Sequence, residues 1–582
     1  MLIVGCQWPR LAARRHFLNW RRCAPNVALS FGLVLALIGP AAAQPLELDF
    51  QDHGLENLNF SGVPLLKSGH PRLRRIVWDD TGATLSLAGS DLPSSTYDEK
   101  TRRLEQTWNM GRLTCVYRPQ AERLQLEIAF TNTSDRPIRY LELAALHFAF
   151  PATPTGLGWY RDMHCTSDSI DDAAAVIASY GKGTVVAVND AFDHEVRLAF
   201  QKDFERPANG YNLIVATINK TATDFVHADP PDLKPRRTIT FQLSLRFGPA
   251  KSGLLELADD EFVRYGERFP RVLEWSDRRP ISMLMLASGS AQHHSDTNPR
   301  AWLNDPTIDV TTLGGRDRFK SRLLDWADFS VLQCRQRGAQ GVIVWDVEGQ
   351  EFHPIVYVGD PRMVSRLAPE LDAIADEFFK KFTDAGLRTG VCIRPSRIAR
   401  RETAKNGSPW WHHHMAFDPV KEMSEKIAYA KKRWGCSLYY VDSNMTYAYP
   451  DKERELARAE PESWTMRADA MRRLAKLHPD TLIIPELQYT GYYSHVSGYK
   501  ELRGGFASTP RRVLLAYPRA FSVINVADGN IAGRRDELVA AVKRGDILLF
   551  RGWYESPESA AVQSIYREAG KDASPEPRVS AP

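Results

Sequence analysis

The sequence predicts a multidomain protein in which an N-terminal antiparallel β-sandwich is followed by a (β/α)8 barrel of the TIM type. The chain has 582 residues, which is too long for a single hydrophobic core. Its first half alternates apolar and polar residues between turn signals, a pattern typical of antiparallel strands. Its second half repeats short apolar runs separated by amphipathic helical stretches, which is typical of parallel strands joined by helices.

The first 43 residues predict an export signal that does not belong to the fold. Arg14 and Arg15 precede Phe17 in a pattern that resembles the twin-arginine export motif. An apolar stretch follows at 26–38, and the alanines at 41–43 form a small-residue cleavage site. A retained N-terminal anchor is the alternative, but the apolar stretch is short for a membrane span. We therefore expect a bacterial protein that is periplasmic or secreted, with no stable membrane anchor.

The cysteines and histidines do not predict a metal site. The cysteines that remain after removal of the signal are far apart and odd in number: Cys115, Cys165, Cys334, Cys392 and Cys436. A Cys115–Cys165 disulfide stays open. The run 412–414 consists of three histidines, but three adjacent residues do not easily face one ion, and no carboxylate lies at helical spacing from them. We expect neither a metal nor another cofactor.

Residues 45–250 predict the β-sandwich. The turn signal at 133–137 is one of several that separate apolar–polar alternations, and no long helical pattern interrupts them. The predicted strands are 122–130, 140–150, 183–189, 195–201, 211–218 and 238–247.

Residues 251–280 predict a linking helix, over 254–268, and residues 281–570 predict the barrel. The expected barrel strands are 282–287, 341–346, 388–394, 437–442, 481–486, 498–502, 521–528 and 546–550. The expected helices between them are 316–338, 369–386, 420–435, 462–477, 510–517 and 534–544. No glycine-rich phosphate loop follows a strand, which disfavours a doubly wound open sheet. The composition of 571–582 predicts a disordered tail.

Charged residues stand at the ends of several predicted barrel strands, where barrel enzymes carry their chemistry. Asp346, Arg394, Asp442, Glu486 and Asp528 each close such a strand. A single acid there is often a helix N-cap, but several acids that converge on one rim indicate a functional site. Asp346 and the acid two residues after it are alternatives, and we expect Asp346 to enter the site.

Paired carboxylates beside aromatic rings predict glycoside cleavage. One carboxyl protonates the leaving oxygen, while the other attacks the anomeric carbon or activates water. Trp410, Trp411 and Tyr489 follow barrel strands, where they would provide platforms for sugar rings, and Arg394 and His353 would bind hydroxyls. The formal net charge of +4 is small for this length and gives no reason to expect nucleic acid as a partner.

The second half of the chain resembles the (β/α)8 glycoside hydrolases, and its sandwich-then-barrel order is similar to retaining α-galactosidase-like enzymes. The distribution of acids is closer to the α-amylase type, and that resemblance implies Asp442 as nucleophile, Glu486 as acid/base and Asp528 as a third, substrate-holding acid. The chain departs from the amylase motif, which has an arginine where Tyr440 stands. In the α-galactosidase pattern the second acid follows strand six, where this chain has Glu501. Glu486, Asp528 and Glu501 therefore stay open as the acid/base.

The sequence thus predicts an exported glycoside hydrolase that acts on an oligo- or polysaccharide. Asp442 and Glu486 would be catalytic, and Asp346 and Asp528 would hold the sugar. A polysaccharide lyase, which would use Arg394 and Tyr447, and a glycan-binding protein without turnover are the alternatives. The sequence leaves open the sugar, its anomer, retention or inversion, and the oligomeric state.

Overall fold

The computed structural model describes most of the chain after its N-terminal segment. The chain divides into two units, Met1–Gln44 and Pro45–Pro582, and the first lies outside the described residues. Within the described part, no helix combines the length and the apolarity that a membrane span requires. The described residues are 46–78, 84–86, 93–155, 159–160, 163–164, 175–192, 196–203, 210–217, 233–287, 291–349, 358–401, 410–415, 418–443, 445–447, 463–466, 468–487, 489–527, 529–554 and 556–570.

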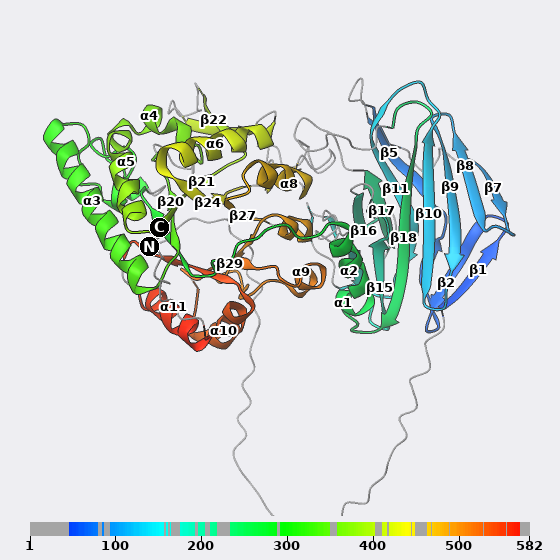
Figure 1. Cartoon of the computed structure of the whole chain (residues 1–582). Helices are drawn as coiled ribbons and strands as arrows, with labels where there is room; N and C mark the ends of the chain where they lie inside the picture. Colours follow the sequence, from blue (N-terminus) through cyan, green and yellow to red (C-terminus); the bar gives the residue numbers. More distant parts are fainter. Residues whose placement is uncertain are drawn as a thin grey trace, which may run out of the picture. The chain divides into compact units, whose positions relative to one another are not determined.

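The first part of the second unit consists of antiparallel sheets, as predicted. A seven-stranded sheet has the order β14-β15-β18-β10-β9-β8-β7, and a six-stranded sheet contains β16-β17-β11-β5-β6 with β4 paired to β11 (Figure 1). Their strands are β4 (Leu66–Ser68), β5 (Arg72–Trp78), β6 (Thr84–Ser86), β7 (Ser94–Asp98), β8 (Arg103–Trp108), β9 (Gly111–Pro119), β10 (Arg123–Asn132), β11 (Ile138–Ala149), β14 (Ala175–Ser179), β15 (Gly183–Asn189), β16 (Val196–Lys202), β17 (Gly210–Thr217) and β18 (Thr238–Pro249).

One hydrophobic core unites these two sheets. It contains Ile128 of β10 and Leu243 of β18 from the first sheet, and Leu143 of β11 and Leu213 of β17 from the second. Burial alternates strictly along β10, which is the period of two that predicted this strand. A smaller sheet consists of β1 (Leu46–Gln51), β2 (Gly54–Phe60) and β3 (Val63–Pro64), and β12 (Trp159–Tyr160) pairs with β13 (Met163–His164).

The predicted linking helix is two helices, α1 (Leu254–Leu257) and α2 (Asp259–Arg268). The break occurs at Ala258, whose φ and ψ are not helical. Helix α2 packs closely against α9 (Arg511–Ala516), because a Cβ atom built on Gly266 would lie 1.9 Å from the carbonyl oxygen of Ala516. A glycine is therefore required at this crossing.

Eight parallel strands form a nearly closed barrel, with the order β27-β24-β21-β20-β19-β30-β29-β28 (Figure 1). The eighth strand of the chain pairs with the first, as a barrel requires. Among the described residues, no hydrogen-bonded ladder joins β27 to β28. A single hydrogen bond bridges this junction, from Ser497 N to Ile483 O at 3.1 Å. The strands are β19 (Ile281–Met285), β20 (Gly341–Trp345), β21 (Arg388–Ile393), β24 (Cys436–Val441), β27 (Leu482–Pro485), β28 (Gly498–Glu501), β29 (Ser522–Asn525) and β30 (Ile547–Arg551).

Helices connect most of these strands and bury their apolar faces on the outside of the barrel. The longer ones are α3 (Leu313–Gln336), α5 (Pro369–Asp384), α6 (Pro419–Trp434), α8 (Ala468–Leu477), α10 (Arg535–Arg544) and α11 (Pro557–Glu568), and α4 (Val364–Leu367) is short. The helix predicted over 462–477 begins later, at α8, because 463–465 form strand β26 (Ser463–Thr465), which pairs with β25 (Met445–Tyr447).

Helix α6 shows how the local sequence defines an element. The side chain of Asp418 accepts a hydrogen bond from Lys421 N, Pro419 occupies the first turn, and Gly435 ends the helix with a φ of 67°. Its apolar residues at helical spacing are buried: Met423, Ile427, Ala430 and Trp434. The helix is thereby fixed behind β21 and β24, whose ends carry the candidate site.

Candidate active site

Alternation along the barrel strands decides which side chains reach the C-terminal mouth of the barrel. Leu438 and Tyr440 of β24 belong to the inner core, as do Leu482 and Ile484 of β27. The next positions of the same alternation are Asp442 and Glu486. Because Val441 pairs with Pro485, these two acids follow neighbouring strands at the same height.

The same alternation places four further polar residues at the mouth. Cys392, Val523 and Leu549 belong to the inner core, and Tyr499 packs against it. The residues two positions after them are Arg394, Asn525, Arg551 and Glu501.

Arg394 and Asp442 form an ion pair between largely buried side chains. Ser443 Oγ donates a second hydrogen bond to Asp442, at 3.0 Å, and Asp442 N donates to Ile393 O, at 2.9 Å. Burial lowers the pKa of Arg394, but the charge of Asp442, the hydrogen bond to Asp442 and the charges of other nearby groups together outweigh burial, so the pKa is raised. The guanidinium therefore stays charged beside Asp442.

Glu486 lies next to this ion pair and has a raised pKa. Its carboxylate oxygen Oε2 accepts a hydrogen bond from Ser443 N at 2.9 Å. Burial, and next the negative charge of Asp442, raise the pKa of Glu486 to about 7. At neutral pH the site thus presents a carboxyl group that can donate a proton, beside a carboxylate that can attack.

Glu501 is held as a hydrogen-bond acceptor. Tyr499 OH donates to it at 2.7 Å, and Asn525 Nδ2 lies 3.1 and 3.3 Å from its two oxygens. The orientation of the Asn525 amide follows from Ala527 N, which donates to its oxygen at 3.0 Å. A carboxylate that receives these bonds is suited to hold a hydroxyl group and not to donate a proton.

Aromatic rings form the floor beneath the acids. The Tyr440 ring lies 5.1 Å from that of Trp345 and 5.0 Å from that of Tyr499, measured between centroids. Burial raises the pKa of Tyr440 and of Tyr499 well above the ordinary value, so both phenols stay neutral. The floor closes the barrel below the site and keeps the medium around the carboxyl groups poor in water.

Asp346 reaches the site through an unusual backbone conformation. Trp345 points into the barrel, so a regular strand would turn Asp346 outward. Instead Asp346 has a φ of +62°, and Gly349 N donates to its carbonyl oxygen at 2.9 Å in a tight turn. Burial, and next the charge of Asp442, raise the pKa of the Cys392 thiol, and the charges of Asp346 and Glu348 contribute as well, so both acids lie near the inner layer.

Glu348 belongs to a separate buried cluster. It is 2% exposed, and burial raises its pKa to about 8, against hydrogen bonds from backbone N–H groups that include that of Asp360. That Asp346 rather than Glu348 enters the site stays a prediction.

Of the remaining predicted site residues, the structure describes the side chain of Tyr489 alone. Tyr489 packs its ring edge against Tyr492 of the outer core, with centroids 5.3 Å apart, and is not part of the inner layer. His353 and Asp528 lie outside the described residues. Trp410 and Trp411 belong to β23 (Trp410–Met415), which pairs with β22 (Ser396–Arg401) directly after β21, but their side chains are also outside the description.

Arg551 is a residue of this layer that the sequence interpretation missed. Its guanidinium lies 5.3 and 5.6 Å from the ring centroids of Trp553 and Tyr554, which stack on each other, and it donates to Tyr554 OH. Asn525 and Tyr499 were missed as well. The available signal was the alternation along the strands, extended by one more position at each strand end.

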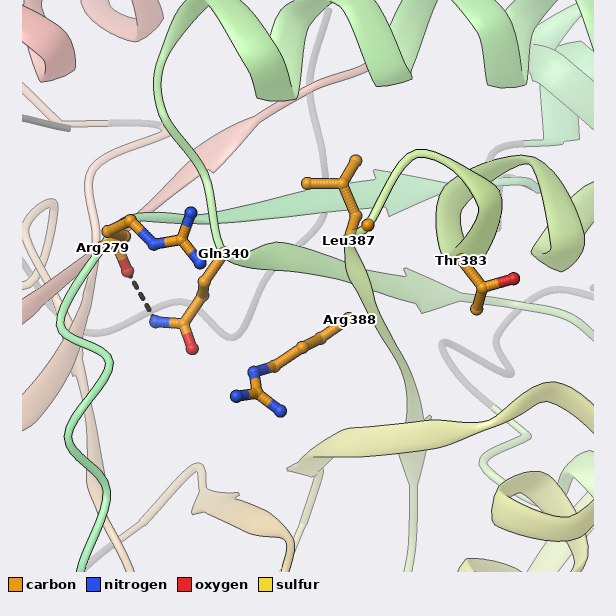
Figure 2. A pocket seen from close by; sticks show the side chains of 6 residues that line it. Arg279, Gln340, Thr383, Leu387 and Arg388 are labelled. Atoms are coloured by element: carbon orange, nitrogen blue, oxygen red, sulfur yellow. Dashed lines mark hydrogen bonds between the residues drawn. The ribbon is translucent and has the colours of Figure 1, made fainter. Parts of the chain in front are cut away.

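A cavity of about 250 Å³ lies at the opposite, N-terminal end of the strands (Figure 2). Gln340 in its wall accepts from Trp275 Nε1 at 3.0 Å and donates to Arg279 O at 2.6 Å, so its amide is used internally. The N-terminal face of such barrels serves stability and not chemistry. In the part of the chain that is described, no group of three or more His, Cys, Asp or Glu residues is suited to hold a metal ion.

No family model and no curated protein matches the chain. Several solved glycoside hydrolases share its general layout. The galactosidase domain of the alpha-galactosidase-sucrose kinase AgaSK is 12% identical, with 88% of this chain and 73% of that chain covered and a TM-score of 0.41. The GH36 alpha-galactosidase AgaB from Geobacillus stearothermophilus is 12% identical over 91% and 75%, with a TM-score of 0.39.

The alpha-N-acetylgalactosaminidase NagBb from Bifidobacterium bifidum is 10% identical, with 91% of this chain and 93% of that chain covered and a TM-score of 0.46. Similarities of this size carry no argument about activity. The function of this chain has to be inferred from its own site residues.

Proposed function

We propose that the protein is an exported glycoside hydrolase that cleaves glycosidic bonds in an oligo- or polysaccharide. Asp442 is the nucleophile and Glu486 is the acid/base. The observation that carries the proposal is the pair at the ends of β24 and β27, an arginine-bound carboxylate beside a carboxyl group whose pKa is raised to about 7. This is the combination that glycoside cleavage requires.

The spacing of the strands supports a retaining mechanism. Asp442 and Glu486 follow paired positions on adjacent strands, and such strands lie about 4.8 Å apart. This backbone spacing suits the separation of about 5–5.5 Å between the carboxyl groups of retaining enzymes better than the about 6.5–9.5 Å that inverting enzymes need to admit a water molecule.

In the first step Asp442 attacks the anomeric carbon, and the glycosidic bond breaks as Glu486 gives its proton to the leaving oxygen. The product is a glycosyl ester of Asp442 and the free alcohol. Esterification removes the negative charge of Asp442, which is the second cause of the raised pKa of Glu486. Glu486 therefore becomes more acidic, stays ionised, and accepts a proton from the water that hydrolyses the ester.

Other residues of the layer hold the sugar. Glu501, fixed by Tyr499 and Asn525, accepts hydrogen bonds from sugar hydroxyls. Asp346, which follows β20 elsewhere on the barrel, does the same. This assignment places Glu501 among the binding residues and leaves the acid/base role with Glu486. The remaining predicted substrate-binding residues stay predictions: His353, Arg394, Trp410, Trp411, Tyr489 and Asp528.

The lyase alternative receives less support from the geometry. A lyase needs a cation to neutralise a uronate and a basic side chain to abstract a proton. Arg394 is already paired with Asp442. The side chain of Tyr447, the base that the lyase alternative names, lies outside the described side chains. The buried phenols of Tyr440 and Tyr499 cannot take its place, because their raised pKa values keep them protonated at neutral pH.

We propose from the sequence that a twin-arginine signal directs export, so that the mature protein is periplasmic or secreted. N-terminal sequencing of the exported product tests this.

Azide rescue tests the nucleophile. Wild type is assayed on panels of α- and β-linked dinitrophenyl glycosides, and Asp442→Gly on those that wild type cleaves. We expect Asp442→Gly to lose turnover by about 10⁴-fold or more, as expected for the loss of a catalytic nucleophile, and azide to restore it. Azide occupies the vacated position, so the product is a glycosyl azide of inverted anomeric configuration.

Asp384→Asn is the matched control, because Asp384 is an exposed aspartate paired with Lys380. It should keep wild-type turnover. Full activity of Asp442→Asn would refute the nucleophile assignment. A folded wild type that binds glycans on an array but cleaves none would instead identify a binding protein without turnover.

A further inference from the structure

Lys426 carries a fully buried ammonium group on α6, on the helix face toward the candidate site. The residue is 0% exposed. Burial lowers its pKa, against the attraction of Asp360 and Glu422. A charge in such a place is costly unless it is paired and its protons are used in hydrogen bonds.

Two of these hydrogen bonds go to backbone carbonyl groups at the end of β21. Lys426 Nζ donates to Arg394 O at 2.8 Å and to Ser396 O at 2.7 Å. The ladder between β21 and β24 ends at Ile393, whose carbonyl oxygen accepts from Asp442 N. Beyond that point the ladder no longer supplies donors, and Lys426 supplies them in its place.

Charged side chains surround the ammonium group. Asp360 and Glu422 each have an oxygen 3.8 Å from Lys426 Nζ, and Arg362 forms ion pairs with both carboxylates. Arg362 also pairs with Glu425, and Glu348 is a further acid that acts on Lys426. Removal of Lys426 alone would leave the buried acids with one cation fewer, which is destabilising.

The backbone of Arg394 is fixed on both sides. Its N–H donates to Gly359 O at 2.9 Å, and its carbonyl oxygen accepts from Lys426. Gly359 has a φ of +63°, and a Cβ atom there would lie 2.8 Å from Arg394 N, so the two segments are in close contact. The side chain of Arg394 extends from this fixed point to Asp442.

We propose that Lys426 is a positioning residue of the site, which holds the end of β21 so that the guanidinium of Arg394 meets the carboxylate of Asp442. Lys426 does not touch the reacting atoms. Its kinetic consequence rests on the proposed hydrolase function, whereas its effect on Asp442 does not.

The test uses a charge-balanced variant of the full chain, Lys426→Met combined with Glu422→Gln, which removes one cation and one anion. We expect kcat/KM on the glycoside that wild type cleaves to fall about 100-fold, the cost of a misplacement of about 1 Å. The loss should fall mainly on kcat and less on KM, because Lys426 does not touch the substrate and acts through the position of Arg394 beside Asp442. Combined with Arg394→Lys, the losses should be less than multiplicative.

Glu422→Gln alone and Lys431→Met are the controls. The first keeps the two bonds of Lys426 to the backbone, and the second removes a lysine of the same helix that pairs with Asp480 on the surface. Both should keep kcat close to that of wild type. An unchanged kcat/KM in the double variant would overturn the proposal, as would losses that multiply with Arg394→Lys.

Crystal structures of the variants separate this proposal from the proposed function. The guanidinium of Arg394 should move away from the carboxylate of Asp442 in the folded double variant and not in Lys431→Met, whether or not any glycan is cleaved. If it does not move, the positioning role is wrong, even if wild type proves to be a hydrolase.

Discussion

At the scale of residues, three buried or half-buried glutamates at strand ends differ because of their neighbours. Glu486 lies beside the carboxylate of Asp442 and has a pKa of about 7, and Glu348 has a pKa of about 8 because burial dominates its surroundings. Glu501 receives hydrogen bonds from Tyr499 and Asn525. The same side chain is thus suited to donate a proton, to stay neutral, or to accept from a hydroxyl group.

The fall of activity at high pH, the alkaline limb of the pH profile, should reflect the titration of Glu486. The first step of the proposed mechanism requires protonated Glu486, so kcat/KM of wild type should fall as pH rises through about 7. In Glu486→Gln this limb should disappear, and kcat/KM on substrates with poor leaving groups should fall about 10²–10⁴-fold. Substrates with dinitrophenyl leaving groups, which need no proton, should lose less. The measurement is a pH profile of kcat/KM for both substrate types.

Glu501→Gln is the matched comparison for this experiment. It changes an acid of the same layer, and we expect weaker substrate binding with the alkaline limb retained. If Glu501→Gln abolishes the limb and Glu486→Gln keeps it, the two roles are exchanged.

At the scale of elements, period-two alternation made much of the site predictable. Asp442, Glu486 and Arg394 continue inward-facing positions of strands whose apolar runs are evident in the sequence. The sequence identified Asp346 as a candidate but did not predict its backbone conformation, because nothing in the sequence reveals its positive φ. Arg551 was missed because its strand end carries no acid.

Longer-range packing decided the remaining elements. The first residues of the stretch 462–477 pair as β26 with β25, a contact across a loop that helical periodicity cannot report. Tyr489 follows a barrel strand, as expected of a platform residue, yet it packs on Tyr492 outside the inner layer. Whether such a residue faces the site or packs elsewhere depends on the conformation of its loop, which no short sequence pattern encodes.

The open junction between β27 and β28 should be visible in hydrogen exchange. Strand β28 pairs with β29 on one side only, whereas β24 has ladders on both sides. We expect the slowest amides of β28 to exchange about tenfold faster than the slowest amides of β24, because local opening needs to break fewer hydrogen bonds. Mass spectrometry of peptides from the two strands measures this. Equal protection would show that the junction is as stable as the rest of the barrel.

At the scale of the whole molecule, the sequence predicted antiparallel sheets followed by eight parallel strands, and the structure confirms both. Turn signals and strand lengths are local properties of the sequence, so the fold class of each half could be predicted from it. The nearly complete closure of the barrel was not, because it depends on hydrogen bonds between strands far apart in the chain.

The stability of the fold should depend on pH through Glu348. Its pKa is about 8 in the folded protein against an ordinary 4.5, so the folded state binds the proton more tightly. The free energy of unfolding therefore falls as pH rises from about 4.5 to about 8. Glu348→Gln should be more stable than wild type at pH 9, by on the order of 2–4 kcal/mol, with a smaller difference at pH 5. Urea unfolding at both pH values measures this.

Glu122→Gln, at an exposed position, is the control and should differ little from wild type at either pH. A difference between Glu348→Gln and wild type that is independent of pH would mean that Glu348 is ionised in the folded protein at both values.

The junction between β27 and β28 gives the two halves of the site unequal mechanical freedom. Asp442 and Glu486 stand on strands joined by a ladder, so their separation is fixed by backbone hydrogen bonds. Glu486 and Glu501 stand on opposite sides of the junction, where no ladder sets the distance between the strands in the described part of the chain. If the protein is the proposed hydrolase, a sugar of different width should therefore shift Glu501 more readily than it alters the separation of Asp442 and Glu486.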